Sequence, residues 1–69
     1  MIDVKKLRGL IAERGYSQRK LAAQMGITGA TFYRKMRKGV FDSDEMMSLI
    51  QILDIQNPAG IFFAEEGTN

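Results

Sequence analysis

The sequence predicts an all-α protein, a compact bundle of about five short helices. Apolar residues recur at intervals of three and four along most of the chain, which is the period of an amphipathic helix. Residues that favour helix starts, and glycines that favour helix ends, divide this pattern into short segments. No stretch alternates between polar and apolar residues as a strand would. The 69 residues suffice for a single domain, which we expect to span residues 1–69.

The first helix is predicted from about Asp3 to Arg14, and Gly15 follows as its stop. Its apolar face consists of Val4, Leu7, Leu10 and Ile11. Ser17 is a favourable N-cap for a second short helix, and Gly26 ends that helix in the left-handed conformation that glycine adopts without strain. In this helix we expect Leu21, Ala22 and Met25 to face inward and Arg19, Lys20 and Gln24 to face outward.

A third helix is predicted from the N-cap Thr28 to about Lys38, where Gly39 ends it. One residue separates the glycine stop of the second helix from this cap, so the connection is very tight. Phe32 and Met36 lie four positions apart and therefore share the buried face.

Two more helices are predicted after it. Asp42 and Glu45 have the spacing of a capping box. The helix that they open has an apolar face made of Met46, Leu49, Ile50 and Leu53. Asn57 and Pro58 supply a cap and an N1 proline for a last, short helix. That helix carries Ile61, Phe62 and Phe63, and we expect residues 65–69 to fray.

Composition excludes several classes of protein. The chain contains no Cys and no His, which excludes disulfide frameworks and Cys/His zinc sites. It also lacks a His general base, a Cys nucleophile and a Gly-rich phosphate loop, so we expect no enzyme, no cofactor and no small-molecule substrate. The N-terminal segment has no apolar stretch of signal-peptide length, and the longest apolar runs are far too short for a membrane span. We therefore expect a cytoplasmic protein without membrane contact.

Charge is distributed unevenly along the chain, although its net value is only +2. Residues 17–39 contain no acid and six basic residues, namely Arg19, Lys20, Arg34, Lys35, Arg37 and Lys38. Residues 40–69 contain six acidic residues and no base. A basic segment of this kind can bind a polyanion even when the whole chain is nearly neutral.

The segment Ser17–Arg34, SQRKLAAQMGITGATFYR, resembles the helix-turn-helix of the lambda repressor and Cro superfamily. Ala22 is small where the two helices of that motif cross closely, and Gly26 makes the turn between them. The residues that would wedge the helices at a fixed angle are Leu21, Ile27 and Phe32. The flanking helices match in order and length, so the resemblance covers about residues 3–63, with the helix-turn-helix itself at about 17–38.

The chain departs from the family pattern at two places in the third helix. Family members usually carry an apolar residue three positions after the Phe32 site, where this chain has Lys35. We expect Met36 to take over this role, since positions i+3 and i+4 lie on nearly the same face. Many relatives also have a base-reading Gln near the start of this helix, where this chain has Gly29 and Ala30.

The resemblance implies sequence-specific binding of double-stranded DNA by a transcriptional regulator, above all a phage-type repressor that occupies its operator. The helix at residues 28–38 would enter the major groove with its N-terminal part toward the bases. The expected base contacts are Thr28, Gly29, Ala30, Tyr33 and Arg34. The expected phosphate contacts are Ser17, Gln18, Arg19, Thr31, Lys35, Arg37 and Lys38. For Arg34, a bidentate grip on guanine and a phosphate contact remain open alternatives.

The expected partners are the operator and a second copy of the chain, because family members commonly bind paired half-sites. The candidate dimer contacts are Ile61, Phe62 and Phe63, with capping of the core as their alternative role. We expect Met46 and Met47 mainly to fill the core, with contact to a partner as their second role. The resemblance also implies action in a bacterial cytoplasm, in association with the nucleoid when bound, and the Phe62-Phe63 ending is similar to short phage-encoded members.

Two other functions remain open. The acidic C-terminal third, rich in Met and Phe, is also typical of a protein-interaction module on the same fold, such as an antitoxin-like or antirepressor-like partner. The absence of the usual base-reading side chains at Gly29 and Ala30 favours a weakly specific architectural DNA binder.

Overall fold

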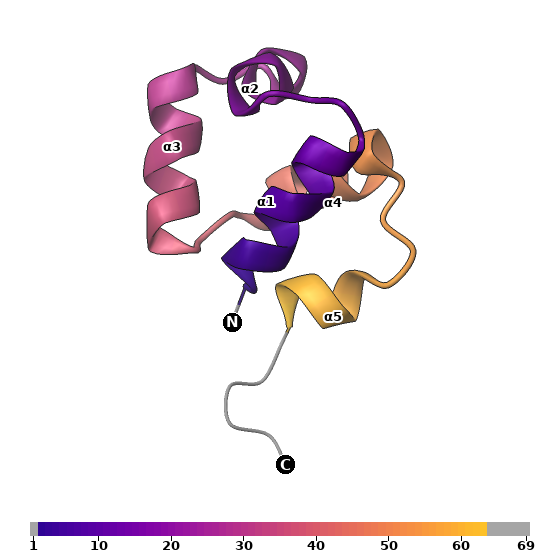
Figure 1. The fold of residues 1–69 in the computed structure, drawn as a ribbon. Helices are drawn as coiled ribbons and strands as arrows, with labels where there is room; N and C mark the ends of the chain where they lie inside the picture. The colour runs from indigo at the N-terminus through magenta and orange to yellow at the C-terminus, as the bar shows by residue number, and fades with distance from the viewer. Residues whose placement is uncertain (1, 64–69) are drawn as a thin grey trace.

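The computed structural model describes residues 2–63, and all regular structure in this part of the chain is α-helical. The helices are α1 (Val4–Glu13), α2 (Gln18–Met25), α3 (Gly29–Lys38), α4 (Ser43–Leu53) and α5 (Pro58–Phe62). In Figure 1, α2 and α3 meet at one corner, α4 lies behind α1, and α5 closes the opposite end of the bundle. The predicted all-α fold is confirmed, whereas the predicted fraying at 65–69 lies outside the described residues.

Each helix begins at a polar residue whose side chain accepts a hydrogen bond from the backbone N–H three positions further on. The distances are 3.1 Å at Asp3, Ser17 and Thr28, 2.8 Å at Asp42 and 3.4 Å at Asn57. The predicted capping box at α4 is complete, since the Glu45 carboxylate also accepts from the Asp42 backbone N–H at 2.9 Å. Short-range sequence signals therefore determine where the chain enters each helix.

The turn between α2 and α3 depends on a left-handed glycine. Gly26 has φ +77° and ψ 23°, a conformation that costs other residues steric strain. The reversal lets the Ile27 N–H donate to the Ala22 carbonyl at 3.0 Å, which closes the last turn of α2. Thr28 then opens α3 directly, so the angle between the two helices is fixed by a very short connection.

The core draws apolar residues from every helix and from the two loops that flank α4. Its buried members are Leu7, Ile11, Leu21, Ala22, Phe32, Met36, Phe41, Leu49, Leu53, Ile55, Ile61 and Phe62. The rings of Phe32 and Phe41 pack at a centroid distance of 5.7 Å, which ties α3 to the segment before α4. Met46 is half-buried against this core, but Met47 is 56% exposed. The expectation that both methionines fill the core is therefore wrong for Met47, because neighbouring residues on a helix point about 100° apart.

Two hydrogen bonds between distant segments fix the ends of α1. The Asp3 backbone N–H donates to the Ile61 carbonyl at 2.7 Å and joins the start of α1 to α5. At the other end, Arg14 Nε donates to the Leu53 carbonyl at 2.7 Å, on the last turn of α4. These contacts hold α1, α4 and α5 as a frame, on which α2 and α3 pack at one side (Figure 1).

Candidate nucleic-acid interface

The outward face of α3 carries most of the residues predicted to contact bases. Thr28, Ala30, Tyr33 and Arg34 are exposed, whereas Gly29 is half-buried. On the opposite face Phe32 and Met36 are buried, so the helix is held by apolar contacts and its polar side is free. Tyr33 is 58% exposed, which leaves its ring available to a ligand.

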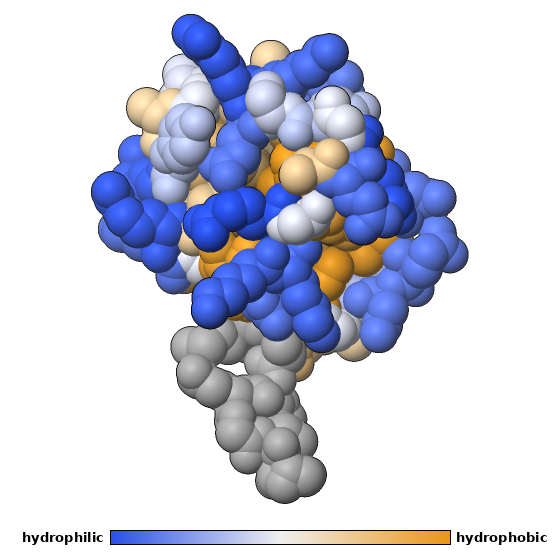
Figure 2. All heavy atoms as spheres, viewed as in Figure 1, coloured by the Kyte–Doolittle hydropathy of each residue, from blue (hydrophilic) through white to orange (hydrophobic). Residues whose placement is uncertain are grey.

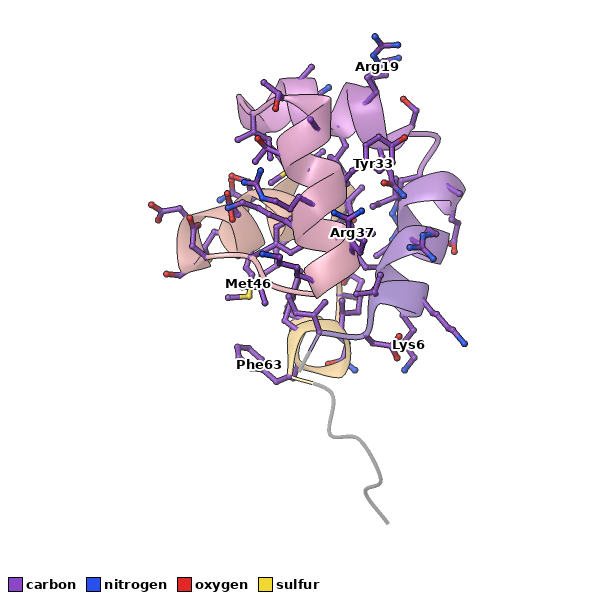
Figure 3. The ribbon with its side chains drawn as sticks, turned by 90° about the vertical axis from the view of Figure 1, so that its left-hand side faces the viewer. Lys6, Arg19, Tyr33, Arg37, Met46 and Phe63 are labelled. Carbon is purple, nitrogen blue, oxygen red and sulfur yellow. The ribbon has the colours of Figure 1, made fainter. Side chains whose placement is uncertain are left out.

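The C-terminal half of α3 adds positive charge to this face. Arg37 and Lys38 are exposed in its last turn, two positions and one position before the left-handed Gly39. Figure 3 shows Tyr33 and Arg37 along the same edge of α3, on the side of that helix where α1 lies. This edge, Tyr33 and Arg37, is called the cationic edge of α3 below.

The start of α2 lies close to the start of α3. Ser17 caps α2, and Arg19 in its first turn is exposed at the top of the view in Figure 3. A Cβ placed on Gly29 would lie 3.9 Å from Arg19 Cγ, so the Arg19 side chain passes over the first turn of α3. The tight turn thus brings two predicted contact residues, ten positions apart in the chain, onto one surface.

Gln18 occupies the first position of α2, where free backbone N–H groups favour an anion. The residue is half-buried, and its Oε1 is buried without a hydrogen-bond partner among the described residues. Because phosphate oxygens only accept hydrogen bonds, a contact from this side chain to a phosphate would have to be donated by Nε2.

Two predicted phosphate contacts are already engaged within the protein. Lys35 Nζ forms an ion pair with Glu45 Oε2 of α4 at 2.5 Å, and its side chain is only 24% exposed. The Thr28 hydroxyl donates to Thr31 Oγ1 at 2.9 Å, and Thr31 is half-buried. The structure therefore does not bring Lys35 together with the exposed cations, and the role of Glu45 as its partner was missed from the sequence.

The three candidate dimer contacts differ in their exposure. Ile61 and Phe62 are 9% and 3% exposed and serve the core, whereas Phe63 is 66% exposed. Phe63 borders a groove of about 190 Å³ between α4 and α5, lined by Ser43, Met46, Met47, Ile50, Pro58, Phe62 and Phe63. Figure 3 shows Met46 and Phe63 on the other side of α3 from Tyr33 and Arg37.

Within residues 2–63, the structure contains no cluster of acidic side chains that could hold a metal ion. The helices in this range are all too short to cross a bilayer.

Comparison with protein families agrees with this geometry. The profile of the family described as Cro/C1-type HTH DNA-binding domain matches residues 6–63, which span the helices that build and support the surface. Searches of curated proteins and of solved structures found no match.

Proposed function

The chain belongs to the family of Cro/C1-type helix-turn-helix DNA-binding domains, and from this premise we propose that it is a sequence-specific transcriptional repressor of the phage type. It would bind double-stranded operator DNA and act by occupying the promoter region. The place of action would be the cytoplasm of a bacterial cell. Repression by occupancy requires only DNA binding, which is the activity that the matched family describes.

The observation that carries this proposal is the exposed, acid-free surface of α2 and α3. Arg19, Arg34, Arg37 and Lys38 are all exposed on these two helices, and residues 17–39 contain no acidic residue. Glu45 of α4 contacts α3, but its carboxylate is occupied by its own cap and by Lys35. Unopposed cations on an exposed helix pair match the electrostatic requirements of a DNA phosphate backbone.

The mechanism follows from how α3 is presented. Its N-terminal half would enter the major groove, which is wide enough for an α-helix. Two guanidinium N–H groups of Arg34 would donate hydrogen bonds to O6 and N7 of a guanine. Ala30 would contact a thymine methyl group. Arg37 and Lys38 would bind phosphates beside the groove, while the backbone N–H groups at the start of α2 bind another. Phosphate contacts fix the position of α3, and base contacts select the sequence.

The first experiment is selection of bound duplexes from a random DNA pool at physiological salt, with the natural chain. We expect enrichment of a two-fold symmetric motif with half-sites about 10 bp apart. A single half-site would correspond to a monomer that reads one groove. Unselective binding that vanishes as salt rises would identify an architectural binder, and absence of binding would contradict the proposal.

Paired substitution tests the surface itself. Arg34→Ala combined with Lys38→Ala should abolish operator binding and leave the helical circular dichroism unchanged, because both side chains are exposed. The matched control is Arg14→Lys, which alters a basic residue that faces the carbonyl of Leu53 and not the proposed DNA surface. Equal binding by the paired variant and the natural chain would reject this placement of DNA.

A symmetric operator would need a second copy of the chain, and the groove between α4 and α5 is the surface we propose for it. The groove is lined almost wholly by apolar side chains, with Met47 and Phe63 more than half exposed. It lies away from the cationic edge of α3, so a second copy bound there would leave that edge free for DNA (Figure 3). Sedimentation equilibrium of the natural chain would test the dimer.

The same groove favours a second candidate function, a protein-interaction module with a different partner. Its exposed apolar side chains are the kind of surface that marks protein–protein contacts. The two candidates differ in the effect of Phe63→Ser, which would abolish a partner complex in this second case. Under the repressor proposal the same variant would still bind a single half-site.

A further inference from the structure

The basic residues of α1 lie outside the helix-turn-helix, and the DNA surface proposed above does not include them. Lys5, Lys6 and Arg8 are exposed, and none of them is in an ion pair within residues 2–63. The only other base in this region, Arg14, is engaged with Glu13 and with the Leu53 carbonyl. Three free cations in the first half of α1 could therefore reach an external anion, provided that they face it.

The packing of α1 distinguishes two sides of this helix. Val4 lies on the side of α3, because a Cβ placed on Gly39 would be 3.5 Å from Val4 Cγ2. Asp3 lies on the side of α5, where its N–H donates to the Ile61 carbonyl at 2.7 Å. The fully buried Leu7 points between them into the core.

Helix geometry then separates the cations. Successive residues are about 100° apart, so Arg8 is only about 40° from Val4, turned outward from the core on the α3 side. Lys5 is about 160° from the buried Leu7 and therefore points away from the bundle. Lys6 is about 160° from Val4 and therefore lies on the opposite side of the helix from α3. Figure 3 agrees with this assignment, since Lys6 lies at the lower edge of α1, level with α5.

Arg8 consequently continues the cationic edge of α3. Arg37 lies on the side of α3 that faces α1, as Figure 3 shows, and Val4 of α1 packs beside Gly39 at the end of α3. The face over α1 and α3 is covered largely by hydrophilic side chains, with apolar atoms showing only between them (Figure 2). A DNA backbone that follows Tyr33 and Arg37 would therefore pass α1 on its Arg8 side.

We propose that Arg8 is a phosphate-binding residue that extends the DNA surface from α2 and α3 onto α1. This inference rests on the proposed function and adds to it a contact outside the helix-turn-helix. A guanidinium can bind two phosphate oxygens through paired N–H donors, which fixes the domain on the duplex. Such a contact sets the position of the domain without reading the sequence.

The test compares Arg8→Gln with Lys6→Gln, which remove the same charge from opposite sides of one helix. Both side chains are exposed, and thermal melts will verify that the variants fold like the natural chain. Fluorescence anisotropy then measures affinity for the selected operator and for an unrelated duplex at several salt concentrations. We expect Arg8→Gln to reduce the slope of log K against log salt by about 0.9 and the affinity at 0.15 M salt by about fivefold, equally on both duplexes.

Lys6→Gln should leave the slope unchanged, and Arg8→Lys should restore most of it because lysine also binds phosphate as a point charge. Equal losses of affinity for Arg8→Gln and Lys6→Gln would overturn the proposal, because they would reflect only the total positive charge of α1. An unchanged slope in Arg8→Gln, or a changed base preference, would overturn it as well. If the natural chain bound no duplex, the proposed function itself would be contradicted, and the Arg8 contact with it. That result is obtained before any variant is measured, so the two failures are distinguishable.

Discussion

Lys35 of α3 and Glu45 of α4 form an ion pair, with Nζ and Oε2 2.5 Å apart. The two side chains are only 24% and 14% exposed, so most of this contact is withdrawn from water. The other carboxylate oxygen, Oε1, accepts the Asp42 backbone N–H at 2.9 Å. One side chain thus closes the first turn of α4 and fixes the middle of α3. Lys35, which departs from the apolar pattern of the family, therefore joins α3 to α4 through an ion pair.

Lys35→Met should leave the salt dependence of operator binding unchanged, because the ammonium group of Lys35 is neutralised by Glu45 and does not release counterions from DNA. Arg37→Gln, by contrast, should reduce the slope of log K against log salt by about 0.9. Anisotropy titrations at several salt concentrations will compare the two variants. A decrease of the same size for Lys35→Met would show that the ion pair opens on DNA and would restore Lys35 to the phosphate contacts.

Local signals explain why so much of the fold could be predicted. The N-caps at Ser17, Thr28 and Asp42 act over three residues, and the periodic faces of the helices over one or two turns. What the sequence could not determine depends on residues far apart in the chain. Arg14 meets the Leu53 carbonyl across 39 positions, and no local pattern identifies the acceptor of such a hydrogen bond.

The same distinction applies to the candidate site. Exposure of Tyr33 and Arg34 follows from the helical period once Phe32 is known to be buried. The neutralisation of Lys35 could not be predicted, because its partner belongs to another helix. The difference in exposure among Ile61, Phe62 and Phe63 could not be predicted either. It arises because α5 ends at Phe62 and only the ring of the following residue lies outside the core.

Gly26→Ala should destabilise the domain by about 1–2 kcal/mol, the cost of a side chain in the left-handed conformation. A Cβ at this position would meet no heavy atom within 4 Å, so the cost is one of backbone strain and not of collision. Gly9→Ala is the matched control, because Gly9 lies within α1 and its Cβ position is equally open. That variant should raise stability by about 1 kcal/mol. Urea unfolding of both variants will measure the difference, and a neutral Gly26→Ala would contradict the assigned role of the turn.

Phe63→Ser should leave stability within about 0.5 kcal/mol of the natural chain, as is usual for exposed positions. Phe62→Ala should cost about 3–5 kcal/mol, because this ring is only 3% exposed and its loss opens a cavity. Thermal melts separate the two effects. If a second copy binds the groove between α4 and α5, Phe63→Ser will also weaken self-association in sedimentation equilibrium. Self-association that is unaffected by this substitution would place the dimer contact elsewhere.

Arg34→Ala should relax the choice of base at a single position of each half-site, because a bidentate contact to guanine contributes about 1–3 kcal/mol of discrimination. Arg34 is exposed on the same face of α3 as Ala30, near enough to the start of the helix to reach the groove floor. Lys38→Ala is the matched comparison, since Lys38 is exposed in the last turn of α3 and would contact only phosphate. It should weaken binding to all duplexes by a similar factor. Selection from random DNA with each variant will distinguish them: loss of one guanine preference identifies Arg34 as the base reader, whereas a uniform loss of affinity would assign it to the backbone.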